Sequence, residues 1–334
     1  MPEPRSEWSI SRAAACGCSR QGAVHVYKRT PCQDAWRIER IREGAHEALV
    51  VTVADGHGAP MHDLSGTGSE LAVQAAVAEA RGLVLGTPGD QTLRQLRLDF
   101  RTEFPHRVVA RWRELVRADA AHRIPGVDLS APDLSRVYHR YGSTLLTVIV
   151  LEKDLLVSSI GDGNALLIRP DGTIGLHVEQ DAPELVGPMT FSLASNDPEL
   201  LFQTILVPRK DGGMLLLSTD GVVNSFIEPT YYLAFGSGLQ ERVRDVGFDE
   251  VANSVPGWLD YLSAHGSGDD VTMVLAWIED ALPVPRRNAG PGRLVRPLAR
   301  SRRYARPAAA GVRRVPLSGL DYRGFARPAG GGSR

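Results

Sequence analysis

The same dipeptide, Asp-Gly, ends three short apolar segments of this 334-residue chain. The segments read VTVADGHG, SSIGDGNA and LLLSTDGV, and their acids are Asp55, Asp162 and Asp220. Short apolar runs rich in β-branched residues predict buried strands, and Asp-Gly is typical of a tight turn. Each dipeptide alone is explained by a turn. Together they lead to the hypothesis that several carboxylates gather at one rim of a β-structure.

The spacing of apolar residues indicates a fold in which strands mostly follow one another directly. Strands are expected at 47–54, at 145–160 as a pair around residues 152–154, and at 164–168, 174–178, 214–219 and 271–278. Helices are expected at 69–81 with Ser65 or Thr67 as the cap, at 92–118 with an interruption at Pro105, and at 249–264 with a break at Pro256. This order favours an α+β sandwich over a doubly wound parallel sheet.

Charge and composition divide the chain at Pro283-Val284-Pro285. Residues 283–334 carry 13 Arg, no Lys and one acid, so their net charge is +12 and that of residues 1–282 is −13. The tail is also rich in Pro and Gly, which predicts a disordered segment after one folded domain, 1–282. A basic tail can serve as a solvated linker, contact anionic partners, or lie against the acidic domain.

Several classes of protein find no support in the sequence. No apolar run reaches the roughly 20 residues that span a bilayer, and the N-terminus lacks a secretory pattern. The three cysteines, Cys16, Cys18 and Cys32, are too few for a disulfide framework, so we expect a cytoplasmic protein. The chain also lacks a Gly-Lys phosphate loop, a G-x-S-x-G elbow, an H-E-x-x-H helix and a Cys followed six positions later by Arg.

The candidate ligands are oxygen atoms. Besides the three Asp-Gly acids, Asp34 follows Gln33, and Asp269-Asp270 precedes the last predicted strand. Carboxylates and backbone carbonyls suit Mg²⁺ or Mn²⁺ rather than Zn²⁺. Two such ions can activate a water molecule and hold a phosphoryl oxygen.

Six short motifs follow one another along the chain: Gln33-Asp34, Val53-Ala54-Asp55-Gly56-His57-Gly58, Gly142-Ser143-Thr144, Gly161-Asp162-Gly163, Ser218-Thr219-Asp220-Gly221 and Asp269-Asp270-Val271-Thr272. Their order resembles that found in the type-2C (PPM) metal-dependent serine/threonine protein phosphatases. The chain resembles this family over about residues 10–280, and its Cys32-Gln33-Asp34-Ala35 resembles a bacterial branch. The resemblance implies a four-layer α/β/β/α sandwich of two antiparallel sheets flanked by helix pairs, with the metals at one rim. It also implies hydrolysis of phosphoserine and phosphothreonine in proteins by a water that two metal ions activate.

The resemblance assigns metal ligands by motif. Asp55 resembles the carboxylate that bridges both metals, and the Gly56 carbonyl resembles a ligand of the second. Asp220 and Asp269 resemble the remaining ligands of the first. Asp162 matches the place of a third metal in bacterial members, although it could simply cap a turn. The expected cofactors are therefore two or three Mg²⁺ or Mn²⁺ ions.

The resemblance also assigns catalytic roles. Asp34 resembles an acid that hydrogen-bonds the metal-bound water. Arg29 matches an Arg that grips the substrate phosphate, with ordinary surface charge as the alternative. His57 resembles a general acid for the leaving oxygen, a role that a near-neutral pKa suits. Asp270 is expected to orient its neighbours, and His25 and His139 are expected to be structural.

Some positions depart from the family pattern. Ala59 replaces a Gly after His57, Gln33 replaces an acid, Asn224 replaces an Asp of some members, and Gly163-Asn164 replaces Ser-Arg. These departures leave open a second function, a catalytically weak pseudophosphatase that acts as a regulatory binding module. The expected partners are a phosphorylated protein and a serine/threonine kinase or its targets.

Overall fold

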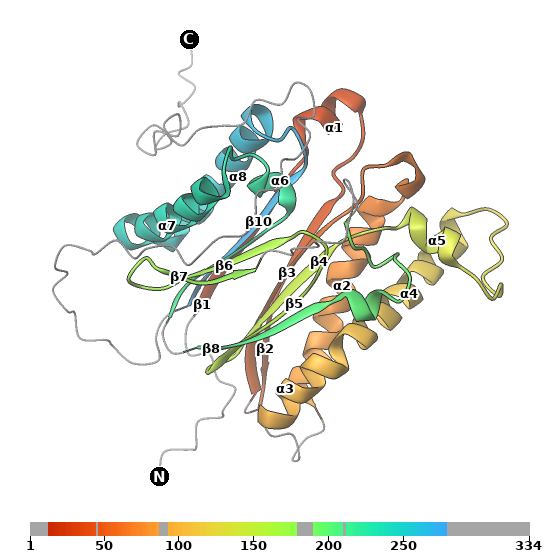
Figure 1. Cartoon of the computed structure of the whole chain (residues 1–334), viewed down its shortest axis with the longest axis horizontal. Helices are drawn as coiled ribbons and strands as arrows, with labels where there is room; N and C mark the ends of the chain where they lie inside the picture. The colour runs from red at the N-terminus through yellow and green to blue at the C-terminus, as the bar shows by residue number, and fades with distance from the viewer. Residues whose placement is uncertain (1–12, 45, 87–92, 179–189, 210–211, 279–334) are drawn as a thin grey trace.

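Two five-stranded antiparallel sheets form the centre of the computed structural model, which describes residues 13–44, 46–86, 93–178, 190–209 and 212–278 (Figure 1). The first sheet has the order β1 (Ala13–Arg20), β10 (Val271–Ile278), β9 (Gly213–Ser218), β6 (Asn164–Ile168) and β7 (Ile174–Val178). The second has the order β2 (Asp34–Glu43), β3 (His46–Asp55), β4 (Leu145–Val150), β5 (Asp154–Ile160) and β8 (Gln203–Pro208).

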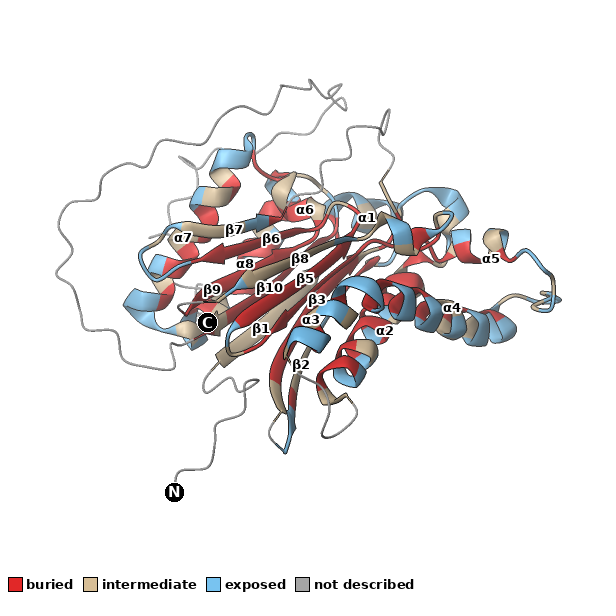
Figure 2. Ribbon diagram, turned by 60° about the horizontal axis from the view of Figure 1, so that its bottom comes forward, coloured by how far each residue is buried: buried red, intermediate tan, exposed pale blue. Residues whose placement is uncertain are grey.

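Helices cover the outer face of each sheet (Figure 2). The second sheet packs against α2 (Ser65–Leu85), α3 (Leu93–Thr102), α4 (Phe104–Arg123) and α5 (Ser135–Arg140). The first packs against α7 (Pro229–Val246) and α8 (Phe248–His265). The short helices are α1 (Ala23–Lys28), η1 (Pro60–His62), η2 (Pro198–Leu201) and α6 (Asp220–Val223). The expected four-layer α+β sandwich is confirmed.

Burial on both faces explains why the strand sequences are continuously apolar. In β3, Leu49, Val51 and Val53 point into the layer between the sheets, whereas Val50 and Ala54 pack against the helices. Strand side chains alternate between faces, so a strand covered on both sides needs apolar residues at every position. The centre of the sandwich therefore consists of two apolar sheet surfaces facing each other.

Most of the expected elements are present, and the differences have local causes. α8 runs unbroken through Pro256, because Val251, Val255 and Leu259 on one side bury its apolar face against the first sheet. The expected cap at Ser65 or Thr67 is wrong: α2 is longer than predicted and its N-cap is Leu64.

The elements that were not predicted are the strands β1 and β8, the helix α7 and the short helices α1, α5, α6, η1 and η2. The predicted tail, residues 283–334, and its boundary lie outside the described residues. None of the helices in the described ranges is long and apolar enough to cross a membrane.

The strand register brings the acidic turns to one rim. Asp34 begins β2 and pairs directly with Asp55, which ends β3. In the other sheet, Thr219 follows β9 and its amide donates to the carbonyl of Thr272 at the start of β10. The residues that flank these ends, including α1 and α6, lie at the same end of the molecule (Figure 1).

Candidate metal centre

The turn that carries Asp55 is fixed by the motif Gly142-Ser143-Thr144. The Asp55 amide donates to Thr144 Oγ1 at 2.9 Å, and the Thr144 amide donates to the Asp55 carbonyl at 2.8 Å. Gly56 forms an isolated bridge with Ser143. These bonds on both sides of the backbone hold the Asp55 carboxylate at the end of its strand.

Gly56 is required by close packing. A Cβ atom at this position would lie 2.7 Å from the carbonyl oxygen of Ser65 and 2.8 Å from that of Gln33. The Gly56 amide donates to the same Gln33 carbonyl at 3.0 Å. The segment before β2 and the start of α2 therefore meet at this glycine, and a side chain would push them apart.

Asp220 is the first residue of α6 and follows the N-cap residue Thr219. The Thr219 hydroxyl donates to Asp34 Oδ2 at 2.8 Å, and Asn224 Nδ2 donates to Asp220 Oδ2 at 2.7 Å. A Cβ atom at Gly221 would lie 2.0 Å from the Asp270 carbonyl oxygen, so this Asp-Gly pair also depends on a close backbone contact. The turn thus connects β9 to both Asp34 and the residues before β10.

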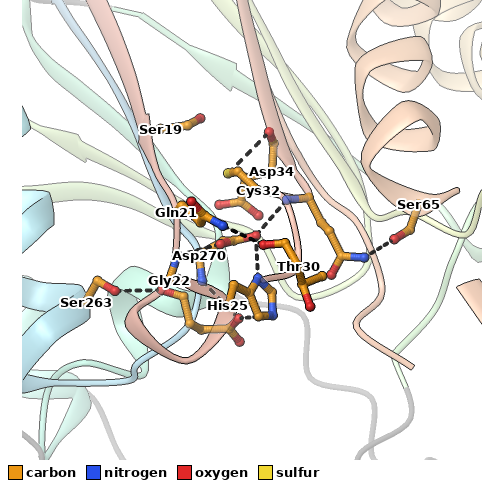
Figure 3. A network of polar contacts seen from close by, with 12 residues as sticks. Ser19, Gln21, Gly22, His25, Thr30, Cys32, Asp34, Ser65, Ser263 and Asp270 are labelled. Carbon is orange, nitrogen blue, oxygen red and sulfur yellow. Dashed lines mark hydrogen bonds and ion pairs between the residues drawn. The ribbon is translucent and has the colours of Figure 1, made fainter. Parts of the chain in front are cut away.

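The adjacent acids Asp269 and Asp270 have different surroundings, and Figure 3 shows the contacts of Asp270. Asp270 is buried, and it accepts the amides of Gly22 and Gln33, each at 2.6 Å. His25 lies between the two acids, with Nδ1 2.9 Å from Asp270 Oδ2 and Nε2 3.7 Å from Asp269 Oδ1. Asp269 is exposed toward the rim, and Asp270 connects to the loop that carries α1.

Asp162 lies in the turn between β5 and β6. Its Oδ2 accepts the Thr190 hydroxyl at 2.8 Å, and its carbonyl accepts Asn164 Nδ2 at 2.9 Å. Its charge contributes to raising the pKa of Asp269, which places these two acids within electrostatic reach. Asp162 is therefore part of the acidic rim as well as part of a hydrogen-bonded turn.

Burial raises the pKa values of the acids at this rim, and the charges of neighbouring carboxylates raise them further. Burial raises the pKa of Asp34 to about 8, and the charge of Asp270 adds to this rise. Burial also raises the pKa of Asp55 well above its usual value, and the charges of Asp34, Asp220 and Asp269 raise it further. The pKa of Asp269 is raised as well, first because neighbouring atoms exclude solvent from part of its surroundings and then by the charges of Asp270 and Asp162, although its side chain is still 52% exposed. Such a group of acids favours either protonation or a bound cation.

The residues fit a divalent cation by their chemistry. The candidate ligands are carboxylates from four separate segments, and Asp34 Oδ1 is buried with no hydrogen-bond partner among the described residues. Hard cations such as Mg²⁺ and Mn²⁺ prefer this all-oxygen set. The side-chain arrangement is not that of a formed metal site: within the described part, no three His, Cys, Asp or Glu side chains are placed to hold an ion.

His57 belongs to a group of three histidines at the rim. Its ring centroid lies 5.0 Å from that of His62, which in turn stacks on His139 at 6.3 Å. Burial lowers the pKa of His57 to about 4, and the charges of His62 and His139 lower it further. The expectation of a near-neutral pKa for this residue is therefore wrong for the protein without metal and substrate.

Arg29 lies outside the acidic group. It is the left-handed C-cap of α1, with φ 59°, and it is exposed. Within the described part of the chain its side chain forms no hydrogen bond or ion pair. The structure thus brings together Asp34, Asp55 and Asp220 and places Asp269, Asp162 and His57 around the same rim, but leaves Arg29 at its edge.

Three histidines form contacts at the rim that the sequence does not show. His25, expected to be structural, contacts both acids before β10, and this contact links α1 to them. His139 was expected to be structural too, and its ring stacks on that of His62, which was not singled out. No local signal separates His25 and His139 from surface histidines, because their partners lie far away in the sequence.

Comparisons with known proteins support the same reading of the fold. The family profile of protein phosphatase 2C matches residues 21–260. The chain belongs to the protein phosphatase 2C family. The expected membership of the type-2C serine/threonine phosphatases is thereby confirmed, while no curated protein matches the chain.

Solved bacterial phosphatases share the fold at low sequence identity. The catalytic domain of the serine/threonine phosphatase PstP in complex with two manganese ions is 20% identical, with a TM-score of 0.50, over 80% of this chain and 99% of that one. The Mycobacterium tuberculosis phosphatase PstP/Ppp is 19% identical, with a TM-score of 0.50 and coverage of 80% and 99%. The S. agalactiae serine/threonine phosphatase is 16% identical, with a TM-score of 0.50 and coverage of 80% and 100%.

Proposed function

We propose that this phosphatase 2C domain hydrolyses phosphoserine and phosphothreonine in proteins, with two or three Mg²⁺ or Mn²⁺ ions. The ligands would be Asp55, the Gly56 carbonyl, Asp220 and Asp269, with Asp162 at a third ion. The observation that carries the proposal is the convergence of carboxylates from β2, β3, α6 and the segment before β10 at one rim, where the pKa values of Asp34 and Asp55 are raised. The two manganese ions of the PstP structure agree with this choice of cofactor.

Bound cations would neutralise phosphate charge and lower the pKa of a water molecule, which supplies the nucleophile. Asp34 would accept a hydrogen bond from that water through Oδ1, because its Oδ2 is already bonded to Thr219. Arg29, exposed at the edge, would contact phosphate oxygens through its planar guanidinium.

His57 would transfer the proton to the leaving serine or threonine oxygen. With a pKa of about 4 it is neutral at pH 7 before substrate binds. A phosphate dianion beside the ring favours the protonated form and so raises that pKa. The proton would thus be taken up as substrate binds and released to the leaving oxygen.

The test is release of phosphate from phosphothreonine peptides with and without Mn²⁺. Wild-type protein should show manganese-dependent release, and Asp55→Asn and Asp220→Asn should reduce the rate by at least 100-fold, as expected for loss of about 3 kcal/mol of transition-state stabilisation. Equal rates for wild type and both variants would refute the proposal.

A second candidate function is a regulatory module that binds phosphoproteins with little turnover. Two observations favour it: Asn224 occupies one oxygen of Asp220 at 2.7 Å, and Gln33, at an acidic position of the family, is bonded to Ser65 at 2.6 Å. Calorimetry with Mn²⁺ separates the candidates. Binding of two or more ions would argue against a catalytically inactive module.

A further inference from the structure

Large apolar side chains are exposed on α1. The structure exposes nine large apolar side chains in its described part, and three of them, Val24, Val26 and Tyr27, lie on this six-residue helix. Tyr27 is 89% exposed and Val26 is 59% exposed. Single exposed apolar residues are ordinary, but a group on one short helix is typical of an interaction site.

The opposite side of α1 is firmly attached to the domain. Its N-terminal end is held by the Ala23 amide on Ser263 Oγ at 2.9 Å and by the Val24 amide on the Gly268 carbonyl at 2.9 Å. His25 adds its contact with Asp270, which also binds the amides before and after the loop (Figure 3). Val26 and Tyr27 are therefore displayed on a fixed support and cannot turn inward without breaking these bonds.

The position and charge of α1 indicate what it can bind. His25 reaches Asp269 of the acidic rim, and α1 lies beyond the strand ends on the same side of the molecule as α6 (Figure 1). The basic residues Lys28 and Arg29 directly follow Tyr27. A polypeptide that places a phosphate at the rim would thus meet two positive charges and two apolar side chains next to it.

We propose that α1 is a docking element for the polypeptide that carries the phosphorylated residue, and that Val26 and Tyr27 contact an apolar side chain close to that residue. This inference rests on the proposed function, because it names the segment that the site would prefer. An anionic segment with an apolar neighbour complements this surface in charge and in polarity. A fixed surface also loses little conformational entropy on binding.

The test compares phosphothreonine peptides whose flanking residues are all Ala, Gly or Ser with peptides that carry one Leu, moved from position −5 to position +5. The protein variants are Tyr27→Ser and the double variant Val26→Ser with Tyr27→Ser. Val246→Ser is the matched control, because Val246 is similarly exposed on α7. The rate of p-nitrophenyl phosphate hydrolysis measures catalysis on a substrate that has no polypeptide to contact α1.

For wild type, at least one Leu position should lower KM about tenfold, the effect of burying much of a leucine side chain. The double variant should lose that preference and keep its rate on p-nitrophenyl phosphate. Val246→Ser should behave as wild type. Equal KM values for all peptides in wild type, or an unchanged preference in the double variant, would overturn the proposal.

Binding of a phosphonate analogue of the Leu peptide, measured by calorimetry, separates failure of docking from failure of the proposed function. If no peptide is hydrolysed but the Leu analogue binds about tenfold tighter than the analogue without Leu, the proposed catalytic function is refuted and the docking proposal stands. If the two analogues bind equally, docking fails. A dimer in light scattering that Tyr27→Ser dissociates would also overturn the proposal, because a second copy would then occupy α1.

Discussion

The substitution Asp270→Asn tests whether one buried carboxylate fixes the loop from Gly22 to Gln33. Each of its oxygens accepts a backbone amide at 2.6 Å, one from each end of the loop. Asparagine keeps the shape but retains only one acceptor, so its NH₂ group faces one of the two amides. The variant therefore loses one hydrogen bond to a charged group and leaves a buried amide without an acceptor.

The expected cost follows from these contacts. A hydrogen bond to a charged group contributes about 1.5–3 kcal/mol, and a buried donor without a partner costs about 1–3 kcal/mol. The lost hydrogen bond and the unpaired amide partly count the same interaction, so the two values are not added in full. We expect a fall of about 3 kcal/mol in the free energy of unfolding. For a domain of this size, that corresponds to a decrease of about 6–12 °C in Tm.

The measurement is denaturant unfolding of the metal-free protein, together with hydrogen exchange of the Gly22 and Gln33 amides. The matched control is Asp269→Asn, the same change one residue earlier. Asp269 is exposed toward the rim and its pKa is raised, so removing its charge should change stability by less than about 1 kcal/mol. Equal losses in both variants, or slow exchange of both amides in Asp270→Asn, would refute the role given to Asp270.

Three further outcomes follow from the acidic rim and the histidine group. Burial raises the folded-state pKa of Asp34 to about 8, so ionisation of this carboxyl group opposes folding above pH 3.8. Metal-free wild type should therefore lose stability relative to Asp34→Asn between pH 4 and 8, by on the order of 5 kcal/mol in the free energy of urea unfolding. Parallel curves of unfolding free energy against pH for the two proteins would contradict this. Mn²⁺ should raise the Tm of wild type by several degrees but raise that of Asp55→Asn far less, as scanning calorimetry with and without EDTA would show. His62→Ala should raise the pKa of His57 from about 4 toward its ordinary value, followed by NMR titration of the ring; an unchanged pKa would mean that burial alone sets it.

The strands and the turns that end them could be predicted because they are local. A run such as residues 47–54 is buried on both faces of the sheet, so all its positions except Glu47 and Thr52 are apolar and the strand is visible in the sequence. β1 was missed because its sequence, AAACGCSR, consists mainly of small residues, and Gly17 leaves room for the ring of Trp36. α7 was missed because its Phe-Gly-Ser-Gly segment weakens the helical pattern, although Gly236 packs closely against Leu166.

The acidic residues of the site could be predicted, but their partners could not. Asp34 and Asp55 are recognisable by their motifs, and register pairs them. The contacts of His25 with Asp269 and Asp270 span more than 240 positions of the chain, and they arise because β1 pairs with β10 in the first sheet. Such contacts depend on which strands become neighbours. The lowered pKa of His57 depends on the fold as well, because burial is its main cause, and His62 and His139 add to it.

The two acids before β10 divide the tasks of the site between neighbouring residues. The Asp269 side chain is 52% exposed, whereas Asp270 is buried and accepts hydrogen bonds from both ends of the loop that carries α1. His25 contacts both. A cation bound at Asp269 and a polypeptide bound at α1 would therefore both act on the contacts that His25 makes with Asp269 and Asp270. Because Asp270 is buried and bonded to both ends of the loop, a displacement of α1 would have to move the backbone of Asp269 as well.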